Sequence, residues 1–210
     1  MTIEFQPWPK IPRLNRDITI TEKIDGTNGA IGIISTSNPE AFPADARECK
    51  LACGGAYIVY AQSRKRLITP ETDNHNFAHW VWEYADQLAP VLGEGLHYGE
   101  WWGSGIQRGY GLENGDKRFS LFNTKRWGEY GESIVPGLGV VPVLYEGPFH
   151  EHEGWETAWR CALDTLEMQG SKAAPGFMDP EGVIVFHHAA NHCFKVTLSG
   201  DEAPKGHDEH

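Results

Sequence analysis

Residues 17–34 read DITITEKIDGTNGAIGII, and they carry the pattern from which the fold is predicted. Apolar and polar residues alternate over residues 17–24, and residues 29–34 are again apolar, which is typical of two β-strands. Asp25-Gly26, between them, is a common turn pair. We therefore expect two strands joined by a tight turn that exposes Lys23 at the end of the first strand.

The same periodicities predict the other elements. Further strands are expected at residues 56–62, 96–101, 118–123, 140–146, 182–186 and 193–198. One helix is expected from its N-cap Asn74 until Pro90 stops it, and another at residues 156–168. Residues 38–55 contain Pro and Gly and are expected to form a loop. Strands dominate without regular alternation with helices, so we predict an α+β fold with antiparallel sheets rather than a doubly wound sheet.

The length of 210 residues suits one domain with a substantial core. We assign residues 1–198 to this domain and residues 199–210 to a polar tail that we expect to be disordered. Apolar runs are far shorter than a membrane span, and the four cysteines show no dense disulfide spacing. These features predict a cytoplasmic protein with no membrane partner.

The formal net charge of -11 argues against a protein that grips nucleic acid over its whole surface, because phosphates are bound by Lys and Arg. Acidic residues, however, cluster at residues 151–156 and 201–210, away from the motifs described next. Basic residues lie nearer to those motifs, namely Arg64, Lys65, Arg66, Arg108, Lys125 and Arg126. Since the local field matters more than the net charge, nucleic acid remains a possible partner.

Six short motifs follow one another along the chain. They are Lys23-x-Asp25-Gly26, Ser63-Arg64, His97-Tyr98-Gly99-Glu100, Phe119-Ser120-Leu121-Phe122, Glu181-Gly182-Val183-Ile184-Val185 and Phe194-Lys195. In kind and order they resemble the motifs of the covalent nucleotidyltransferases, which comprise DNA ligases, RNA ligases and mRNA capping enzymes. The resemblance covers about residues 20–198, and it implies an antiparallel nucleotidyltransferase (adenylation) domain.

Within this superfamily, residues 99–110 (GEWWGSGIQRGY) are similar to the ATP-dependent phage and bacterial RNA ligases that repair nicked duplexes. The fifth residue after the motif lysine is Asn28, as in that group, whereas DNA ligases and capping enzymes usually have Arg there. A neutral amide hydrogen-bonds ribose or nucleic-acid groups where an Arg fork would pair with an anion. The resemblance therefore favours RNA over DNA.

The resemblance implies that Lys23 is the nucleophile that carries AMP. A lysine in water has a pKa near 10.4 and is protonated at neutral pH, so it needs cations nearby to become nucleophilic. Lys195, Arg64 and a bound Mg²⁺ or Mn²⁺ would supply this charge and would also neutralise the triphosphate. Glu181, at the start of an apolar strand, is assigned to the metal.

The remaining implied contacts are to the nucleotide. Glu100 is expected to contact the ribose of the adenylate, and Phe122 to stack on adenine. Phe119 is left open as the rival, because the two phenylalanines point to opposite faces of a regular strand. The residues predicted to bind the nucleotide are Glu22, Ile24, Asn28, Arg64, Glu100 and Phe122.

The sequence departs from the family pattern after Lys195. These ligases usually have two lysines one residue apart, but here Val196 and Thr197 follow, which we expect to weaken phosphate contact or lysine activation. In addition, Asp25 stands where the nick-repair group often has His. Fifteen residues follow Lys195, so we expect a catalytic domain without an OB domain, which would grip RNA by its own surface or through a separate nucleic-acid-binding protein.

Together these observations predict an ATP-dependent RNA ligase that forms a lysyl-AMP intermediate and joins 5′-phosphate to 3′-hydroxyl ends. A DNA ligase or a capping-type transferase is the alternative within the superfamily. A non-catalytic nucleotide- or RNA-binding module with the same fold is the alternative of another class, favoured by the missing second lysine and the acidic charge. Nicked duplexes, single strands and damaged tRNA all remain open as substrates.

Overall fold

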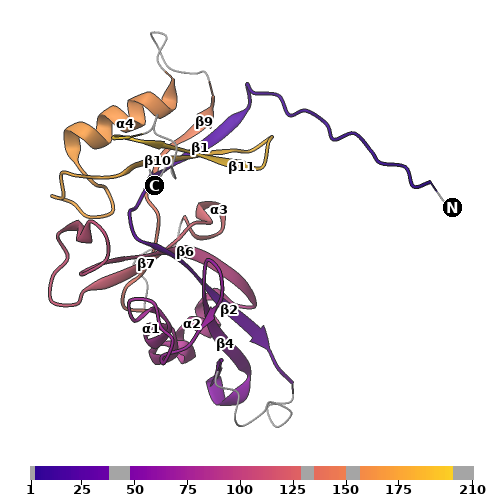
Figure 1. Cartoon of the computed structure of the whole chain (residues 1–210), viewed down its shortest axis with the longest axis vertical. Helices are drawn as coiled ribbons and strands as arrows, with labels where there is room; N and C mark the ends of the chain where they lie inside the picture. Colours follow the sequence, from indigo (N-terminus) through magenta and orange to yellow (C-terminus); the bar gives the residue numbers. More distant parts are fainter. Residues whose placement is uncertain (1–2, 38–47, 129–134, 150–156, 201–210) are drawn as a thin grey trace, which may run out of the picture.

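The computed structural model describes residues 3–37, 48–128, 135–149 and 157–200, which form two β-sheets that face each other (Figure 1). The pairing is antiparallel except between β7 and β8, so the predicted α+β class with antiparallel sheets is confirmed. The elements in chain order are β1 (Asp17–Lys23), β2 (Thr27–Ser35), β3 (Lys50–Ala52), η2 (Cys53–Gly55), β4 (Tyr57–Ser63), β5 (Leu67–Ile68), α1 (Phe77–Glu83), α2 (Ala85–Leu92), β6 (Gly95–Gly103), η3 (Gly109–Gly111), β7 (Lys117–Leu121), α3 (Thr124–Trp127), β8 (Leu138–Val140), β9 (Val143–Pro148), α4 (Ala158–Gln169), β10 (Gly182–His187) and β11 (His192–Thr197).

The smaller sheet has the strand order β11-β10-β1-β9, with β1 between two partners. Ile18 and Ile20 alternate with Thr19 and Thr21 along β1, and both isoleucines are fully buried against helix α4. The threonines therefore face the other sheet. This alternation places Lys23, the next residue of the threonine series, on the same inner face.

The larger sheet has the order β3-β4-β2-β6-β7-β8, with β5 beside β4. Helices α1 and α2 cover its outer face, and its core is aromatic: Phe77 and Trp80 of α1 pack against Trp101 and Phe119 of the sheet. The ring centroids of Phe77 and Phe119 are 5.0 Å apart. Burying several such rings supplies most of the apolar area that stabilises this half.

The short connection expected at Asp25-Gly26 joins two strands that do not pair with each other as a hairpin. Both strands exist, but β1 pairs with β9 and β10, whereas β2 pairs with β4 and β6 in the other sheet. The turn pair is thus a crossing between sheets, and Gly26 passes so close to Trp101 that an added Cβ would lie 2.5 Å from its carbonyl oxygen. The strand expected at residues 140–146 is likewise two strands, because β8 lies in the larger sheet and β9 in the smaller.

The first predicted helix also differs from the expectation. It is divided at Tyr84 into α1 and α2, and Pro90 lies inside α2, which continues to Leu92. Proline leaves the carbonyl four residues earlier without its helical partner, and here that carbonyl, of Asp86, accepts a hydrogen bond from Cys53 Sγ at 3.3 Å. Asn74 does not cap α1; its amide donates to Thr27 instead.

Several short elements were not predicted: strand β3 and the 3-10 helix η2 within the expected loop, strand β5, the 3-10 helix η3 and the short helix α3. The other predicted strands are present with ends shifted by a few residues, and α4 is the second predicted helix. Residues 201–210, most of the predicted tail, lie outside the described residues, as do most of residues 38–55. No helix in the described part of the chain is long and apolar enough to span a membrane.

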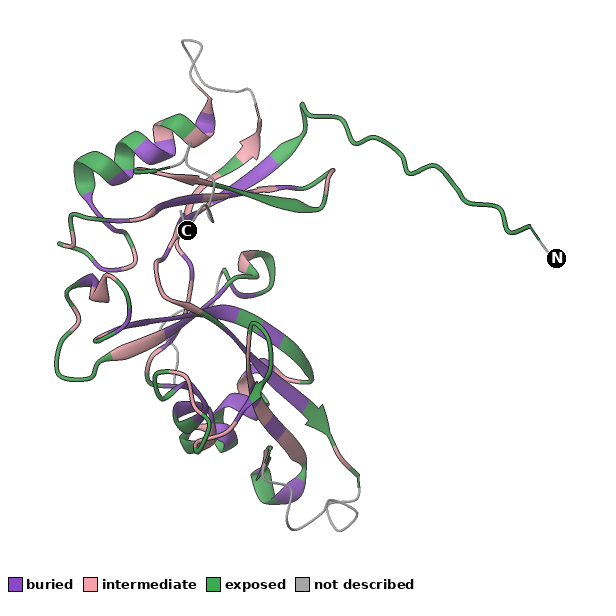
Figure 2. Cartoon of the chain, viewed as in Figure 1, coloured by how far each residue is buried: buried purple, intermediate pink, exposed green. Residues whose placement is uncertain are grey.

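A third buried cluster joins the two sheets. Its members come from both crossings and from the segments around them: Ile24, Trp102, Tyr110, Val141 and Ala174. Trp102 and Tyr110 meet edge to face with ring centroids 5.3 Å apart, and the Trp102 indole donates to Ser120 Oγ at 2.9 Å. In Figure 2 the two stretches of chain that pass from one sheet to the other are mostly half-buried.

Candidate active site

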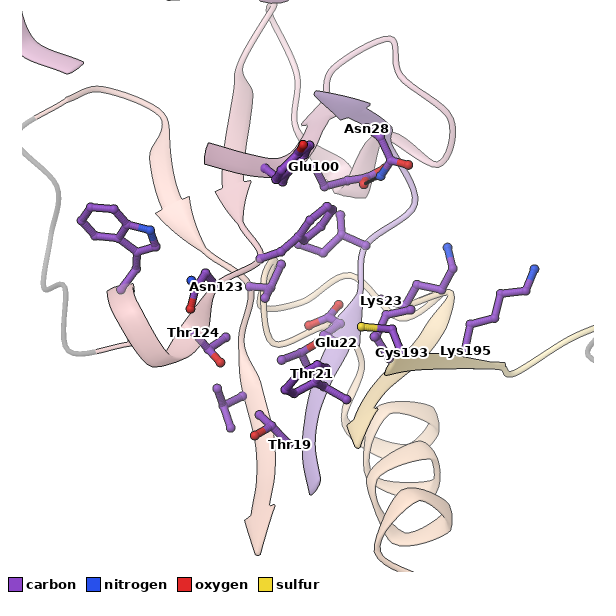
Figure 3. Close-up of a pocket in the computed structure, with 18 of the residues that line it drawn as sticks. Thr19, Thr21, Glu22, Lys23, Asn28, Glu100, Asn123, Thr124, Cys193 and Lys195 are labelled. Atoms are coloured by element: carbon purple, nitrogen blue, oxygen red, sulfur yellow. Dashed lines mark hydrogen bonds between the residues drawn. The ribbon is translucent and has the colours of Figure 1, made fainter. Parts of the chain in front are cut away.

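A cleft of about 1700 Å³ lies between the sheets. Sites for single small molecules usually measure about 300–1,000 Å³, so this cleft has room for more than one nucleotide. Both sheets and α3 line it, and Figure 3 shows part of the lining. All the predicted catalytic, nucleotide-binding and metal-binding residues line it: Glu22, Lys23, Ile24, Asn28, Arg64, Glu100, Phe122, Glu181 and Lys195.

Lys23 and Glu181 form an ion pair in the cleft. Lys23 is the last residue of β1 and is the register partner of Gly182, the first residue of β10, so Glu181 lies beside it. The lysine ammonium donates to Glu181 Oε2, and the two side chains are 21% and 12% exposed. The nucleophile candidate and the metal-ligand candidate are therefore in direct contact and are both reachable from solvent.

The other two predicted cations, Lys195 and Arg64, also line the cleft. Lys195 lies on β11 in register with Ile184, which in turn faces Thr21. In Figure 3 the Lys195 side chain projects into the cleft beside Lys23. Arg64 directly follows β4 and reaches the cleft from the larger sheet. Positively charged side chains thus line the cleft on both sheets.

Glu100 and Asn28 are a cross-strand pair on β6 and β2. The Asn28 amide donates to Glu100 Oε2 at 2.6 Å, and Glu100 is 8% exposed. Burial raises the pKa of Glu100 to about 7, and the nearby Lys23 charge and the Asn28 hydrogen bond offset only part of that rise. This carboxyl is a buried hydrogen-bonding group suited to a hydroxyl-bearing ligand.

The Glu22 carboxylate faces away from Lys23 and is buried in a different contact. It accepts hydrogen bonds from the Ser171 hydroxyl at 2.5 Å and from the backbone N–H groups of Lys172 and Ala173, each at 2.8 Å. Its side chain therefore fastens the segment after α4 to β1. Ile24 is also largely packed, as a member of the cluster that joins the sheets. For both residues nucleotide contact stays a prediction.

The two candidate stacking residues lie in different places. Phe119 is fully buried among the core aromatics of the larger sheet, so it cannot face a ligand. Phe122 follows β7, lines the cleft and is 42% exposed. Strand alternation separates the two residues as expected, and only Phe122 of this pair is available to a base.

A bridge of charges that sequence reasoning did not assign connects two segments beside the cleft. Arg108 Nε donates to Asp25 Oδ2 at 3.2 Å, and its Nη1 donates to Asp179 Oδ1 at 2.6 Å and to the Asp179 carbonyl at 3.0 Å. The Asp25 N–H donates to the Tyr110 hydroxyl at 2.8 Å. Asp25 lies two residues after Lys23, and Asp179 lies two residues before Glu181. Arg108 therefore connects the segment that carries Lys23 to the segment that carries Glu181.

Comparison with known proteins agrees with these observations. The family model described as RNA ligase matches residues 16–197. None of the curated proteins matches the chain. Among solved structures, variants of the RNA ligase of Naegleria gruberi align over 87% of this chain: one with ATP and Mn at 14% identity and TM-score 0.52, one with AMP and Mn at 15% and 0.51, and one without ligand at 14% and 0.51.

The chain spans about half the length of these solved structures, covering 49–50% of them. At such low identity the structural likeness shows the shared fold alone. The family model, in contrast, covers most of the sequence and includes all the predicted site residues from Glu22 to Lys195. This chain belongs to the RNA ligase family.

Proposed function

We propose that this protein is an ATP-dependent RNA ligase that acts through a covalent lysyl-AMP intermediate. Lys23 Nζ attacks the α-phosphorus of ATP, an N–P bond forms, and the bond to pyrophosphate breaks. The adenylate then passes to a 5′-phosphate end of RNA, releasing the lysine. Finally a 3′-hydroxyl attacks that 5′-phosphorus and displaces AMP, which seals the strand. The family assignment and relatives solved with ATP or AMP and Mn support this sequence of steps.

The observation that carries the proposal is the placement of Lys23. Its amine lies inside the cleft in contact with Glu181 and is flanked by Lys195, while the neighbouring polar residue Glu22 is turned away into a buried contact. Lys195 and Arg64 line the same cleft and would bind the triphosphate. No other lysine of the cleft forms an ion pair in the described part of the chain.

The donor set fits a divalent cation. Glu181 supplies a partly exposed carboxylate, the oxygen ligand that Mg²⁺ and Mn²⁺ prefer, and bound phosphates would complete the coordination. A bound cation neutralises phosphate charge as the phosphorus is attacked. Glu181 of this chain would hold it.

The opposite wall of the cleft fits the nucleoside. Glu100, fixed by Asn28, would accept a hydrogen bond from a ribose hydroxyl, and Phe122 would stack on adenine. Because the Asn28 side chain is a neutral amide, it adds no positive charge here, in keeping with an RNA ligase rather than a DNA ligase or capping enzyme. The cleft volume leaves space for the strand ends beside the nucleotide.

One specific observation favours a second candidate, a nucleotide-binding module without ligase activity. Thr197 stands where the family usually has its second lysine, so one phosphate contact is missing on β11. This candidate retains ATP binding but predicts no covalent adduct.

The experiment that separates the two uses α-labelled ATP with Mg²⁺ and looks for label that survives denaturation. We expect label on the wild type, none on Lys23→Ala, and wild-type label on the control Lys117→Ala, a lysine at the start of β7 outside the cleft lining. Labelled GTP run in parallel distinguishes a capping-type enzyme. ATP binding without covalent label would support the module and overturn the ligase.

A further inference from the structure

The N-terminal segment, residues 3–16, leaves the body of the protein as an extended arm (Figure 1). Its apolar side chains are unusually exposed: Phe5 and Trp8 are both 87% exposed, Ile11 85% and Leu14 63%. Figure 2 shows the whole arm as exposed. Large aromatic side chains left in water are a marker of an interaction surface.

The spacing of these residues is regular. Phe5, Trp8, Ile11 and Leu14 recur every third residue. A second series, with the same spacing, is basic: Lys10, Arg13 and Arg16. Polyproline II has three residues per turn, and Pro7, Pro9 and Pro12 favour it, so the arm presents an apolar row and a separate basic row.

The charge of the arm is opposite to that of the chain. Its three basic residues stand against one acidic residue, Glu4, whereas the whole chain carries a formal charge of -11. Aromatic faces beside a row of cations are the combination by which proteins bind nucleic-acid strands, since bases stack on the rings and phosphates meet the cations.

The arm is anchored at the end of β1 opposite to Lys23. His187 Nε2 contacts the Leu14 carbonyl at 2.7 Å, and the Phe149 N–H donates to the Arg16 carbonyl at 3.2 Å. A strand rises about 3.3 Å per residue, so the root lies roughly 20 Å from Lys23. At about 3.1 Å per residue the arm itself can span roughly 40 Å. It can therefore lie along the nucleic acid that flanks a join in the cleft.

We propose that residues 3–16 are an RNA-binding arm that grips the strand flanking the reacting ends. This inference rests on the proposed function, in which RNA is the substrate. The acidic body gives little electrostatic attraction to phosphates, so the arm supplies it. Phe5 and Trp8 on the outer half stack on bases, and Lys10 and Arg13 contact phosphates. A protein partner or a second copy of this chain is the competing occupant, and the experiment below distinguishes them.

The test uses the full chain and a nicked RNA duplex or a single-stranded RNA as probe. The variants are Phe5→Ala with Trp8→Ala, Lys10→Gln with Arg13→Gln, and the control Met168→Ala, an apolar residue on α4 that is 71% exposed. We expect the aromatic pair to weaken RNA binding about tenfold or more. The basic pair should lower the slope of log affinity against log salt by about 1 to 2. The control should bind as the wild type does.

Two parallel measurements keep the outcomes separate. Covalent labelling by ATP, which needs no RNA, tests the proposed function by itself. Sedimentation of each variant tests for a second copy. Three results would each overturn the proposal of an RNA-binding arm. They are an unchanged RNA affinity in the arm variants, an absence of RNA binding by the wild type, and a change that is confined to self-association. If RNA binding depends on the arm but ATP leaves no covalent label, the RNA-binding arm is supported and the proposed ligase function is rejected.

Discussion

The two sheets differ in what they contribute to the cleft. The smaller sheet carries the groups proposed to react, Lys23, Glu181 and Lys195, and packs on a single helix through small and aliphatic residues. The larger sheet carries Glu100 and Phe122, the proposed nucleoside contacts, and packs on two helices through aromatic rings. Neither sheet holds a complete site, so the chemistry depends on how rigidly the two are joined.

The largest expected effect comes from breaking the junction itself. Trp102→Ala removes a buried indole and its hydrogen bond to Ser120, so we expect the free energy of unfolding to fall by about 3–5 kcal/mol. Denaturant unfolding measures it. A loss below about 1 kcal/mol would show that the cluster containing Trp102 does not hold the sheets together.

Next in size is the loss of the partner of Lys23 in the smaller sheet. Glu181→Gln removes the carboxylate proposed to hold the cation, and we expect the rate of covalent labelling to fall about 100-fold. Single-turnover labelling with ATP and Mg²⁺ measures the rate. Glu167→Gln, an exposed carboxylate on α4, is the matched control and should label normally. Equal rates for both variants would remove Glu181 from the metal site.

In the larger sheet we expect Glu100 to make the stability of the protein depend on pH. The pKa of Glu100 is raised from 4.5 to about 7 by burial, so the folded protein binds this proton more tightly than the unfolded chain does. The stability from this residue is therefore fully present below pH 4.5 and is lost as the pH rises through about 7. Glu100→Gln should not show that loss. Between pH 5 and pH 8 we expect the free energy of unfolding of the wild type to fall by about 2 kcal/mol more than that of the variant. Parallel stability curves for both proteins would contradict the buried state of Glu100.

The smallest effect is expected at the bridge between the segments. Arg108→Ala breaks the contacts to Asp25 and Asp179, so Lys23 and Glu181 should be less well positioned and labelling should slow roughly tenfold. These pairs are partly exposed, so unfolding should change by less than about 1 kcal/mol. Arg160→Ala on α4 is the control, and Arg108→Lys should restore part of the rate. If the free energy of unfolding fell by as much as the free-energy equivalent of the rate loss, Arg108 would have a structural role only.

Sequence reasoning identified the residues of the site better than the way in which they meet. The order of motifs brought Lys23, Glu100 and Glu181 into one hypothesis, and the structure places all three around one cleft. The sequence did not show that β1 and β2 join different sheets, because Asp-Gly is a local turn signal, whereas the sheet that each strand joins is decided by distant partners. Arg108 was missed as a bridge for the same reason, since its two acceptors are 83 and 71 residues away.

Burial explains the other differences. Phe119 and Phe122 are equivalent in the sequence, and only packing shows that Phe119 belongs to the aromatic core. Alternation along β1 turns the Glu22 carboxylate to the face opposite Lys23, where three donors satisfy it, and its nucleotide contact stays a prediction. Such assignments need the three-dimensional environment of each side chain.

The measurement that tests the central claim most directly is mass spectrometry of the protein after incubation with ATP and Mg²⁺. We predict an adduct with the mass of AMP, confined to the peptide that contains Lys23 and removed when pyrophosphate or a nicked RNA duplex is added. An adduct on Lys195 or another residue, or no adduct when ATP is bound, would contradict the assignment of Lys23 as the nucleophile.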